Sequence, residues 1–242
     1  MTRIALATAP PDLAFAPVVE TAVNGVHALL DPLGGLVLPD DGILVVSDLH
    51  LEKGAAFARR GMMLPPYDTL ATLKLLARLV DRHDPKVVVS LGDTFHDRVG
   101  AAMMPQPFRE MIAAMARGRE WIWIAGNHDP DGVADLPGVF LDTFRHGALT
   151  FRHEPSLGPS TRGEIAGHLH PAAVVTRREK SVRRACFATD GARLIMPAFG
   201  VTTGGLDLRH KAMTGLFDRA ALIAHLLGRD RIYSVRFSNL AG

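Results

Sequence analysis

The chain has 242 residues, 48% of them hydrophobic and 21% charged, which suffices for one large domain and excludes a disordered or collagen-like chain. The formal charge of +2 and the pI near 8.9 make the protein slightly basic. This excess of positive charge is too small to predict a nucleic-acid partner unless cations cluster locally. The one cysteine, Cys186, excludes an internal disulfide framework and a cysteine-rich zinc site, and agrees with a reducing compartment. No internal repeat or linker divides the sequence, so we predict a single domain over residues 1–242.

The start of the chain, residues 1–20, is rich in alanine and proline and could be mistaken for a signal peptide. Pro10, Pro11 and Asp12 interrupt its apolar residues, and no run approaches the roughly 18 apolar residues of a membrane span. We therefore expect a cytoplasmic protein whose first 20 or so residues pack loosely.

The next segment has the composition of a hairpin followed by a buried strand. Two short apolar runs, 26–30 and 36–38, flank a turn rich in proline and glycine at 31–35. Residues 43–47 form a continuous apolar run, which is typical of a strand buried on both faces.

Helix and strand patterns then alternate. Residues 87–91 and 121–125 repeat the buried-strand pattern, and 68–81 and 108–116 place apolar residues at helical spacing. A helix between two buried strands predicts parallel crossover units.

After residue 138 the runs become shorter, with glycine and proline between them, which predicts a mainly β half. A last helix at 218–227 and a strand at 234–237 are expected to close the chain. The expected strands of this half are 139–144, 149–152, 164–166, 173–176, 185–189 and 194–198.

Side chains that bind metals follow five of the apolar runs. Strand ends can hold residues from distant positions close together, so we expect them to form one site. Asp, Asn and His donors suit Mn²⁺, Fe or Zn²⁺ better than a calcium cage or a thiolate zinc site. In chain order, the candidate ligands are Asp48, His50, Asp93, Asn127, His153, His168 and His170.

These donors fit a centre with two metal ions. Ions about 3.5–4 Å apart need an anionic bridge, for which Asp93 is the candidate. Two divalent ions carry four positive charges, whereas Asp48 and Asp93 are the only carboxylates in the set. The remaining positive charge would attract a phosphate and acidify a bridging water, so the set predicts phosphoester hydrolysis.

The same motifs, in the same order, resemble those of the calcineurin-like metallophosphoesterase superfamily, and no element of the family pattern is missing. The resemblance implies an α/β (α+β) fold with two packed mixed β-sheets flanked by helices, and a motif core over residues 43–171. The motifs are Asp48-Leu49-His50, Gly92-Asp93, Gly126-Asn127-His128-Asp129, His153 and Gly167-His168-Leu169-His170.

The resemblance also implies a division of the ligands. One metal would take Asp48, His50, Asp93 and His170, and the other would take Asp93, Asn127, His153 and His168. His128 would remain as the catalytic non-ligand beside the scissile phosphate, where it stabilises charge or protonates the leaving oxygen, and Asp129 would orient it.

A longer stretch is similar to the bacterial DNA-ligase-associated metallophosphoesterases, the PdeM family. This similarity implies phosphodiesterase or nuclease chemistry in DNA repair and a functional association with an ATP-dependent DNA ligase. It covers residues 47–54, 57–61, 64–67, 92–97, 153–155, 197–200 and 203–205.

Two histidine assignments stay open. His146 and His153 both lie near the place of the fourth motif, and His153 is favoured because it follows the apolar run 149–151 and so ends a strand. His96 lies close to Asp93 and could contact the substrate, support a ligand or be exposed. The interpretation of the other histidines is that they lie on the surface or flank helices: His27, His83, His210 and His225.

Two sets of basic residues are also candidates for substrate contact. Lys53, Arg59 and Arg60 could reach a phosphate, although a solvated helix face explains them nearly as well. A second cluster could follow a nucleic-acid backbone, but no aromatic residues are interleaved with it and a charged hairpin tip explains it equally well. This cluster comprises Arg177, Arg178, Lys180, Arg183 and Arg184.

Our hypothesis is a dinuclear metal-dependent phosphoesterase, with two Mn²⁺ ions, acting on a phosphodiester such as DNA. The alternative enzyme is a hydrolase of small nucleotides or nucleotide-linked metabolites, because the same centre serves many substrates. A third hypothesis is a scaffold that has lost catalysis and binds protein partners, against which the complete ligand set and His128 argue.

Overall fold

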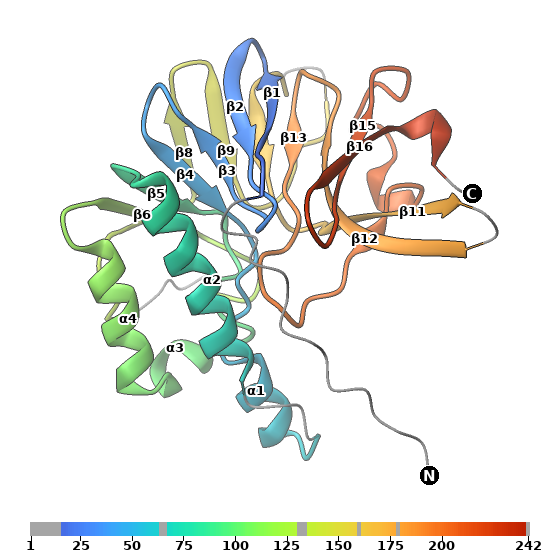
Figure 1. Ribbon diagram of the computed structural model, residues 1–242. Coiled ribbons are helices and arrows are strands. Elements are labelled where there is room, and N and C mark those ends of the chain that lie inside the picture. The colour runs from blue at the N-terminus through green and yellow to red at the C-terminus, as the bar shows by residue number, and fades with distance from the viewer. Residues whose placement is uncertain (1–15, 63–66, 130–134, 159–160, 178–179, 241–242) are drawn as a thin grey trace.

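The computed structural model describes residues 16–62, 67–129, 135–158, 161–177 and 180–240. Within these residues the chain forms two β-sheets and a group of helices beside the first sheet (Figure 1). No helix among the described residues combines the length and the apolar character needed to cross a membrane.

The first sheet has seven strands in chain order, β1-β2-β3-β4-β5-β6-β7. Neighbours from β1 to β4 are antiparallel, and those from β4 to β7 are parallel. The strands are β1 (Val19–Val23), β2 (Val26–Leu30), β3 (Leu36–Leu38), β4 (Ile43–Val46), β5 (Val87–Ser90), β6 (Glu120–Ile124) and β7 (Val139–Leu141).

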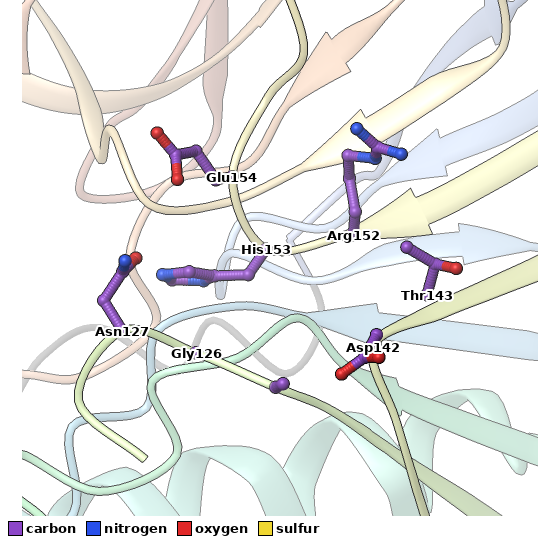
Figure 2. A pocket seen from close by; sticks show the side chains of 8 residues that line it. Gly126, Asn127, Asp142, Thr143, Arg152, His153 and Glu154 are labelled. Atoms are coloured by element: carbon purple, nitrogen blue, oxygen red, sulfur yellow. The ribbon is translucent and has the colours of Figure 1, made fainter. Parts of the chain in front are cut away.

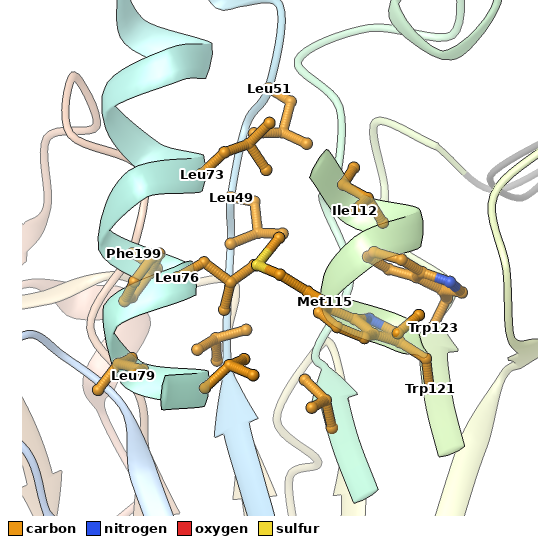
Figure 3. Packing of buried hydrophobic residues seen from close by; sticks show 14 of the residues in the cluster. Leu49, Leu51, Leu73, Leu76, Leu79, Ile112, Met115, Trp121, Trp123 and Phe199 are labelled. Atoms are coloured by element: carbon orange, nitrogen blue, oxygen red, sulfur yellow. The ribbon is translucent and has the colours of Figure 1, made fainter. Parts of the chain in front are cut away.

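Helices connect the parallel strands and cover one face of this sheet. The helices are α1 (Lys53–Arg59), α2 (Asp68–His83), α3 (Gly100–Met103) and α4 (Gln106–Ala116). Leu73 and Leu76 of α2, Ile112 of α4, and Trp121 and Trp123 of β6 are buried in one cluster between helices and strands (Figure 3). This packing fixes the strand ends from which the next loops depart.

The second sheet has the strand order β14-β11-β12-β13-β10-β9-β8. Outside this order, β15 pairs with β12, and β16 pairs with β15. Its β9 and β10 are parallel neighbours, as are β10 and β13. The strands are β8 (Thr143–His146), β9 (Leu149–Arg152), β10 (Glu164–Ala166), β11 (Pro171–Arg177), β12 (Lys180–Thr189), β13 (Leu194–Ile195), β14 (Leu206–Asp207), β15 (Ile223–Leu227) and β16 (Ile232–Arg236), with short 3₁₀ turns at η2 (Lys211–Met213) and η3 (Phe237–Asn239).

The two sheets pack face to face. One buried cluster joins Val45 and Val89 of the first sheet to Phe151, Ile165 and Phe187 of the second. Strands β4 and β5 therefore have helices on one face and a sheet on the other, which explains their continuous apolar sequences. The expected fold class, two packed mixed sheets with helices, is confirmed.

Most elements lie where the sequence predicts them, including the hairpin of β2 and β3 and both crossover helices. The predicted strand 139–144 is instead two strands, β7 and β8, which belong to different sheets. The predicted strand 194–198 is shorter, since β13 ends at Ile195. At the start, residues 1–15 lie outside the described residues, but Val19 and Glu20 pair with β2 in a strand that the sequence pattern does not predict.

The predicted helix at 218–227 is wrong. Residues 223–227 form β15, which pairs with β12 on one side and β16 on the other. The run of alanine and leucine favours a helix locally, but pairing with β12 and burial of Ala224 and Leu226 override that preference.

Candidate metal centre

The candidate ligands lie in five loops that meet at one edge of the two sheets. Strands β4, β5 and β6 are parallel, so the loops that follow them leave at the same edge, and β9 and β10 do the same in the second sheet. Backbone hydrogen bonds tie the loops together: His50 N donates to Asp93 O at 2.9 Å, and Gly167 N donates to His153 O at 2.9 Å. The scaffold therefore brings residues from position 48 to position 170 into one site.

Among the residues that the structure describes, two groups of side chains have ligand atoms close enough to hold a metal ion. The first group contains Asp48, His50 and His170, and the second contains Asp93, His153 and His168. In each group the ligand atoms lie within 4.8 Å of one another. The groups agree with the division that the sequence resemblance implies, apart from the additional ligands discussed below.

The first group is built around Asp48, which is fully buried. Its Oδ1 lies 2.9 Å from Nε2 of His170, and its Oδ2 accepts hydrogen bonds from the Ser47 hydroxyl and from His168 N. Burial raises the pKa of the Asp48 carboxyl, but His170, His153 and Ser47 outweigh burial, so this pKa is lower than usual. Asp48 is therefore held as an anion.

Burial raises the pKa of Asp48 but lowers the pKa of both histidines of this group. It lowers the pKa of His50 to about 3. At His170 burial also lowers the pKa, but the Asp48 carboxylate outweighs it and the pKa is raised. Since a metal ligand must be neutral imidazole, cation binding and protonation compete at His170.

In the second group, His153 is held in one ring orientation. Its Nδ1 lies 2.8 Å from the carbonyl oxygen of Leu91, to which it donates, so that Nε2 keeps a free lone pair. This Nε2 lies 3.2 Å from Nδ1 of His168 and 3.5 Å from Oδ1 of Asp93. Burial lowers the pKa of His168, which favours the neutral ring that metal binding requires.

Asp93 lies between the two groups. Its Oδ1 faces His153 of its own group, and its Oδ2 lies 3.9 Å from Nε2 of His50 in the other group. Its Oδ1 also accepts a 2.9 Å hydrogen bond from His128 N. With one oxygen toward each group, Asp93 has the position that a bridging carboxylate requires.

The donor chemistry fits two transition-metal ions. Nδ1 of His50 and Nε2 of His170 are buried, and neither has a hydrogen-bond partner among the described residues. The short separation of His170 Nε2 from Asp48 therefore lacks hydrogen-bond alignment, although the two atoms attract each other. A cation bound by the first group would give Nε2 of His170 the partner that it lacks.

Backbone strain is concentrated at the same residues. Asp48, His50, Asp93, His168 and His170 all have φ between 44° and 66°, a left-handed conformation that side chains other than glycine rarely adopt. Such strain is typical of functional sites, where the surrounding structure holds a side chain in a required direction.

Glycines allow the loops to approach each other. A Cβ on Gly167 would lie 2.6 Å from Oδ2 of Asp48, and a Cβ on Gly126 would lie 2.6 Å from Oδ1 of Asp129 and closer still to Asp93. Both motif glycines are thus required because of space, not because of an unusual φ.

His128 lies beside the centre without joining either group. Its ring is 46% exposed, and its Nδ1 lies 2.7 Å from the carbonyl oxygen of His96, to which it donates. Its Nε2 points toward the centre, 3.8 Å from Oδ2 of Asp93. His96 stacks on His128 with ring centroids 5.5 Å apart, and burial lowers the pKa of His96.

Asp129 has a different contact from the one expected. Its buried Oδ2 accepts a 3.1 Å hydrogen bond from Phe95 N, and the His128 ring is held by the His96 carbonyl instead. Consecutive residues of this turn project in different directions, so the Asp129 carboxylate faces Phe95 N and not the His128 ring. Burial, with the Asp93 charge, raises the pKa of Asp129 to about 6.

Asn127 is exposed and lines a cavity of about 320 Å³ with His153. Figure 2 shows the His153 ring pointing toward Asn127, which comes from the loop after β6. Asn127 can therefore add an oxygen to the second group. The other residues of this cavity are Ala125, Gly126, Asp142, Thr143, Arg152 and Glu154.

The structure distinguishes His153 from the alternative His146. His146 lies in β8 with its Nε2 3.0 Å from Oδ1 of Asp41, whereas His153 belongs to the second group. Of the remaining histidines, His27 and His210 are exposed and His83 ends α2. His225 is a correction, because it is buried in β15 and bonds to Ser234 at 2.7 Å.

The basic residues after the first motif have protein partners. Lys53 Nζ donates to Thr202 O at 3.0 Å, and Arg59 forms two hydrogen bonds with Asp97, at 2.7 and 3.0 Å. Arg60 is exposed at the end of α1. Lys53 remains close enough to His50 and His96 to lower their pKa values, after the larger effect of burial, so it lies at the mouth of the centre.

Two features that support the centre have roles that the sequence does not indicate. Ser47, buried next to Asp48, donates to its carboxylate, and its only sequence signal is its position in the first motif. Glu164 is buried and accepts from Ser156 while pairing with Arg193 at 3.2 Å. This network anchors the segment that follows His153, and its long-range partners leave no local pattern in the sequence.

Comparison with known proteins agrees with this geometry. A family model described as calcineurin-like phosphoesterase matches residues 42–180. The nuclease MPE of Pseudomonas putida is 25% identical, its match covers 90% of this chain and 100% of that chain, and the TM-score is 0.70. The phosphoesterase YfcE of E. coli is 15% identical over 81% of this chain and 98% of its own, with a TM-score of 0.41. A search of curated proteins gives no match.

The family match extends over more than half of the chain and contains every candidate ligand, from Asp48 to His170. The fold of this chain, two packed sheets with helices, is also the fold of the nuclease MPE. The chain therefore belongs to the calcineurin-like phosphoesterase family and is a phosphoester hydrolase with two groups of candidate metal ligands.

Proposed function

We propose that this protein is a dinuclear metal-dependent phosphodiesterase that acts as a nuclease on DNA. The observation that carries the proposal is the pair of ligand groups on either side of Asp93, with His128 beside them. The similarity to a nuclease over nearly the whole chain supports a nucleic acid as the substrate, and the resemblance to the DNA-ligase-associated metallophosphoesterases is the reason for proposing DNA.

In this proposal each metal has four protein ligands. Asp48, His50, Asp93 and His170 hold one, and Asp93, Asn127, His153 and His168 hold the other, so that Asp93 is shared. Two bound divalent ions supply Lewis-acid stabilisation of the phosphoryl oxygens and acidify water. Mn²⁺ is the ion we propose, because imidazole with carboxylate and amide oxygens suits it; Fe and Zn²⁺ fit the same donors.

The protein's own residues orient the substrate and move a proton. Because Nδ1 of His128 donates to the His96 carbonyl, Nε2 is the atom that can carry a proton to the leaving oxygen. The exposure of His128 lets this ring reach a substrate at the surface of the centre. Lys53 and His96 at the mouth of the centre can contact phosphates beside the scissile one.

The proposed cellular role is ligase-associated DNA repair in the cytoplasm. It rests on a similarity to the DNA-ligase-associated metallophosphoesterases, which also suggests a functional association with an ATP-dependent DNA ligase. The similarity covers residues 47–54, 57–61, 64–67, 92–97, 153–155, 197–200 and 203–205.

Two substitutions test the metal centre. In Asp93→Asn we expect loss of bound metal and of bis(p-nitrophenyl) phosphate hydrolysis, since the bridge is gone. In His128→Asn we expect bound metal to remain while turnover falls by about 10²- to 10⁴-fold. His146→Asn is the matched control, because it removes a histidine that lies outside both groups. Unimpaired turnover in both Asp93→Asn and His128→Asn would refute the assignment.

A substrate panel tests the DNA proposal. With Mn²⁺ supplied, single-stranded DNA should be cleaved with a higher kcat/KM than cyclic nucleotides or nucleoside diphosphate esters. Hydrolysis confined to the small nucleotides would instead favour the alternative enzyme. A protein that binds no Mn²⁺ on reconstitution would favour the non-catalytic scaffold.

A further inference from the structure

Strands β15 and β16 lie beside the β11–β12 hairpin (Figure 1), and side chains of these four strands line a groove. It has a volume of about 550 Å³ and a mainly aliphatic floor from Val175, Val182, Leu226 and Val235. These side chains share one face of the sheet, because Val175 pairs with Val182, and Leu226 pairs with Tyr233. The floor of the groove is the solvent-exposed edge of a buried hydrophobic cluster that contains Leu226.

The rim of the groove is cationic. Lys180 and Arg184 come from β12, and Arg229 comes from the turn between β15 and β16. Asp230 is the acidic residue of the lining, and it already pairs with Arg231 at 3.2 Å. Charge complementarity therefore favours an anionic occupant.

An aromatic side chain lies beside these cations, which the sequence alone does not reveal. Tyr233 of β16 is 48% exposed, and its hydroxyl donates to Asp230 at 3.1 Å. A Cβ on Gly228 would lie 2.5 Å from the Tyr233 ring, so the ring packs closely on the Gly228 backbone. The ring is held in place with part of its surface open to solvent.

The hairpin also connects the groove to the metal centre. A smaller cavity of about 210 Å³ is lined by His170, Arg183 and Gly205, and Arg184 lines this cavity as well as the groove. Arg183 extends across the cavity and donates to Gly205 O. Cations on this one hairpin therefore reach from beside a candidate metal ligand to the groove.

We propose that the groove between β12 and β15–β16 binds a single-stranded segment of nucleic acid outside the metal centre. The bases would lie on Tyr233 and the aliphatic floor, and the phosphates would lie on Lys180, Arg184 and Arg229. An aromatic surface beside a row of cations is the combination that binds single strands without sequence preference. This inference rests on the proposed nuclease function and adds a second contact to the same substrate.

Binding is measured by fluorescence anisotropy with a short fluorescein-labelled oligothymidylate, in buffer with EDTA so that the strand stays intact. In Tyr233→Leu, which keeps an apolar side chain, we expect about tenfold weaker binding because the stacking surface is lost. In Lys180→Gln, the slope of log K against log salt should fall by about 0.7, since one phosphate contact is lost. A structural defect alone would not change this slope.

Arg236→Gln is the matched control. Arg236 lies on the same strand as Tyr233 but one register position from Val235, on the opposite face, and its loss removes the same charge as Lys180→Gln. We expect wild-type affinity and salt slope for this variant. The ratio of kcat/KM for oligothymidylate to that for bis(p-nitrophenyl) phosphate should fall about tenfold in Tyr233→Leu.

Two results would overturn the groove assignment. The first is wild-type affinity and salt slope in both Tyr233→Leu and Lys180→Gln. The second is a wild-type protein that sediments as a dimer and dissociates on Tyr233→Leu, since the groove would then be an interface between two copies. Failure of the wild-type enzyme to hydrolyse bis(p-nitrophenyl) phosphate is a different outcome: it would refute the proposed function, while the binding data still decide the groove.

Discussion

Gly167 offers a steric test of the metal centre. An alanine Cβ at this position would lie 2.6 Å from Oδ2 of Asp48 and closer still to the Ser47 hydroxyl. Ordinary contact begins at 3.4 Å, so the carboxylate oxygen must retreat by about 0.8 Å. Metal–ligand distances tolerate only about 0.2 Å. Gly167→Ala should therefore disable the group of Asp48, His50 and His170 and affect the group around Asp93 less.

The expected losses follow from these distances. A misplacement near 1 Å costs about 10²-fold in rate, so hydrolysis of bis(p-nitrophenyl) phosphate should fall by about that factor. Overpacking costs about 1–3 kcal/mol of stability, which lowers Tm by roughly 2–12 °C in a domain of this size. Elemental analysis after Mn²⁺ reconstitution should find about one equivalent of metal fewer than in the wild type.

Gly204→Ala is the control for this experiment. No heavy atom lies within 4 Å of a Cβ on Gly204, and neither Gly204 nor Gly167 has a φ in the left-handed range. The two variants therefore differ in the steric contact and not in backbone strain. Full metal content and wild-type turnover in Gly167→Ala would refute the assignment of Asp48 to the metal centre.

Three further measurements test the surrounding structure. Asp31 is fully buried and lies 3.2 Å from Arg82 and 2.7 Å from His83, so Asp31→Asn should lower the urea unfolding free energy by about 3–5 kcal/mol. Burial lowers the pKa of His225 from 6.5 to about 4, so the unfolded chain takes up a proton that the folded protein resists. The free energy of unfolding should accordingly fall by up to about 3 kcal/mol as pH drops from about 6.5 to about 4, and this fall should shrink in His225→Gln. Finally, EDTA should lower Tm and excess Mn²⁺ should restore it, because ligand at 100 times its Kd stabilises the folded state by about 2.7 kcal/mol per site.

Much of the site could be predicted because its ligands follow strands with strong local patterns. The runs that become β4, β5 and β6 are continuous and apolar, and parallel strands place the residues that follow them at one edge. Asp48 and Asp93 were therefore expected to meet, although 45 positions separate them in the chain.

What could not be predicted depends on contacts between distant residues. The alanine and leucine run at 220–227 has helical propensity, and only its pairing with β12 makes Ile223–Leu227 a strand. The same pairing brings Tyr233 to the basic hairpin, where the sequence shows cations without an aromatic neighbour. Asp129 adjoins His128 in the chain, but the turn directs its carboxylate to Phe95 N instead.

The strained backbone of the ligands has a consequence for how the centre is held. Left-handed conformations cost about 1–2 kcal/mol at each non-glycine residue, and here they occur at Asp48, His50, Asp93, His168 and His170. Hydrogen bonds between the loops oppose this cost, including His50 N to Asp93 O and Leu206 N to His170 O. Hydrogen bonding is also incomplete in the same place, since Nδ1 of His50 and Nε2 of His170 have no partner among the residues that the structure describes. Bound cations would relieve the second cost and not the first, so the loops must be shaped by the two sheets before any metal arrives, and binding should stabilise the fold without rebuilding it.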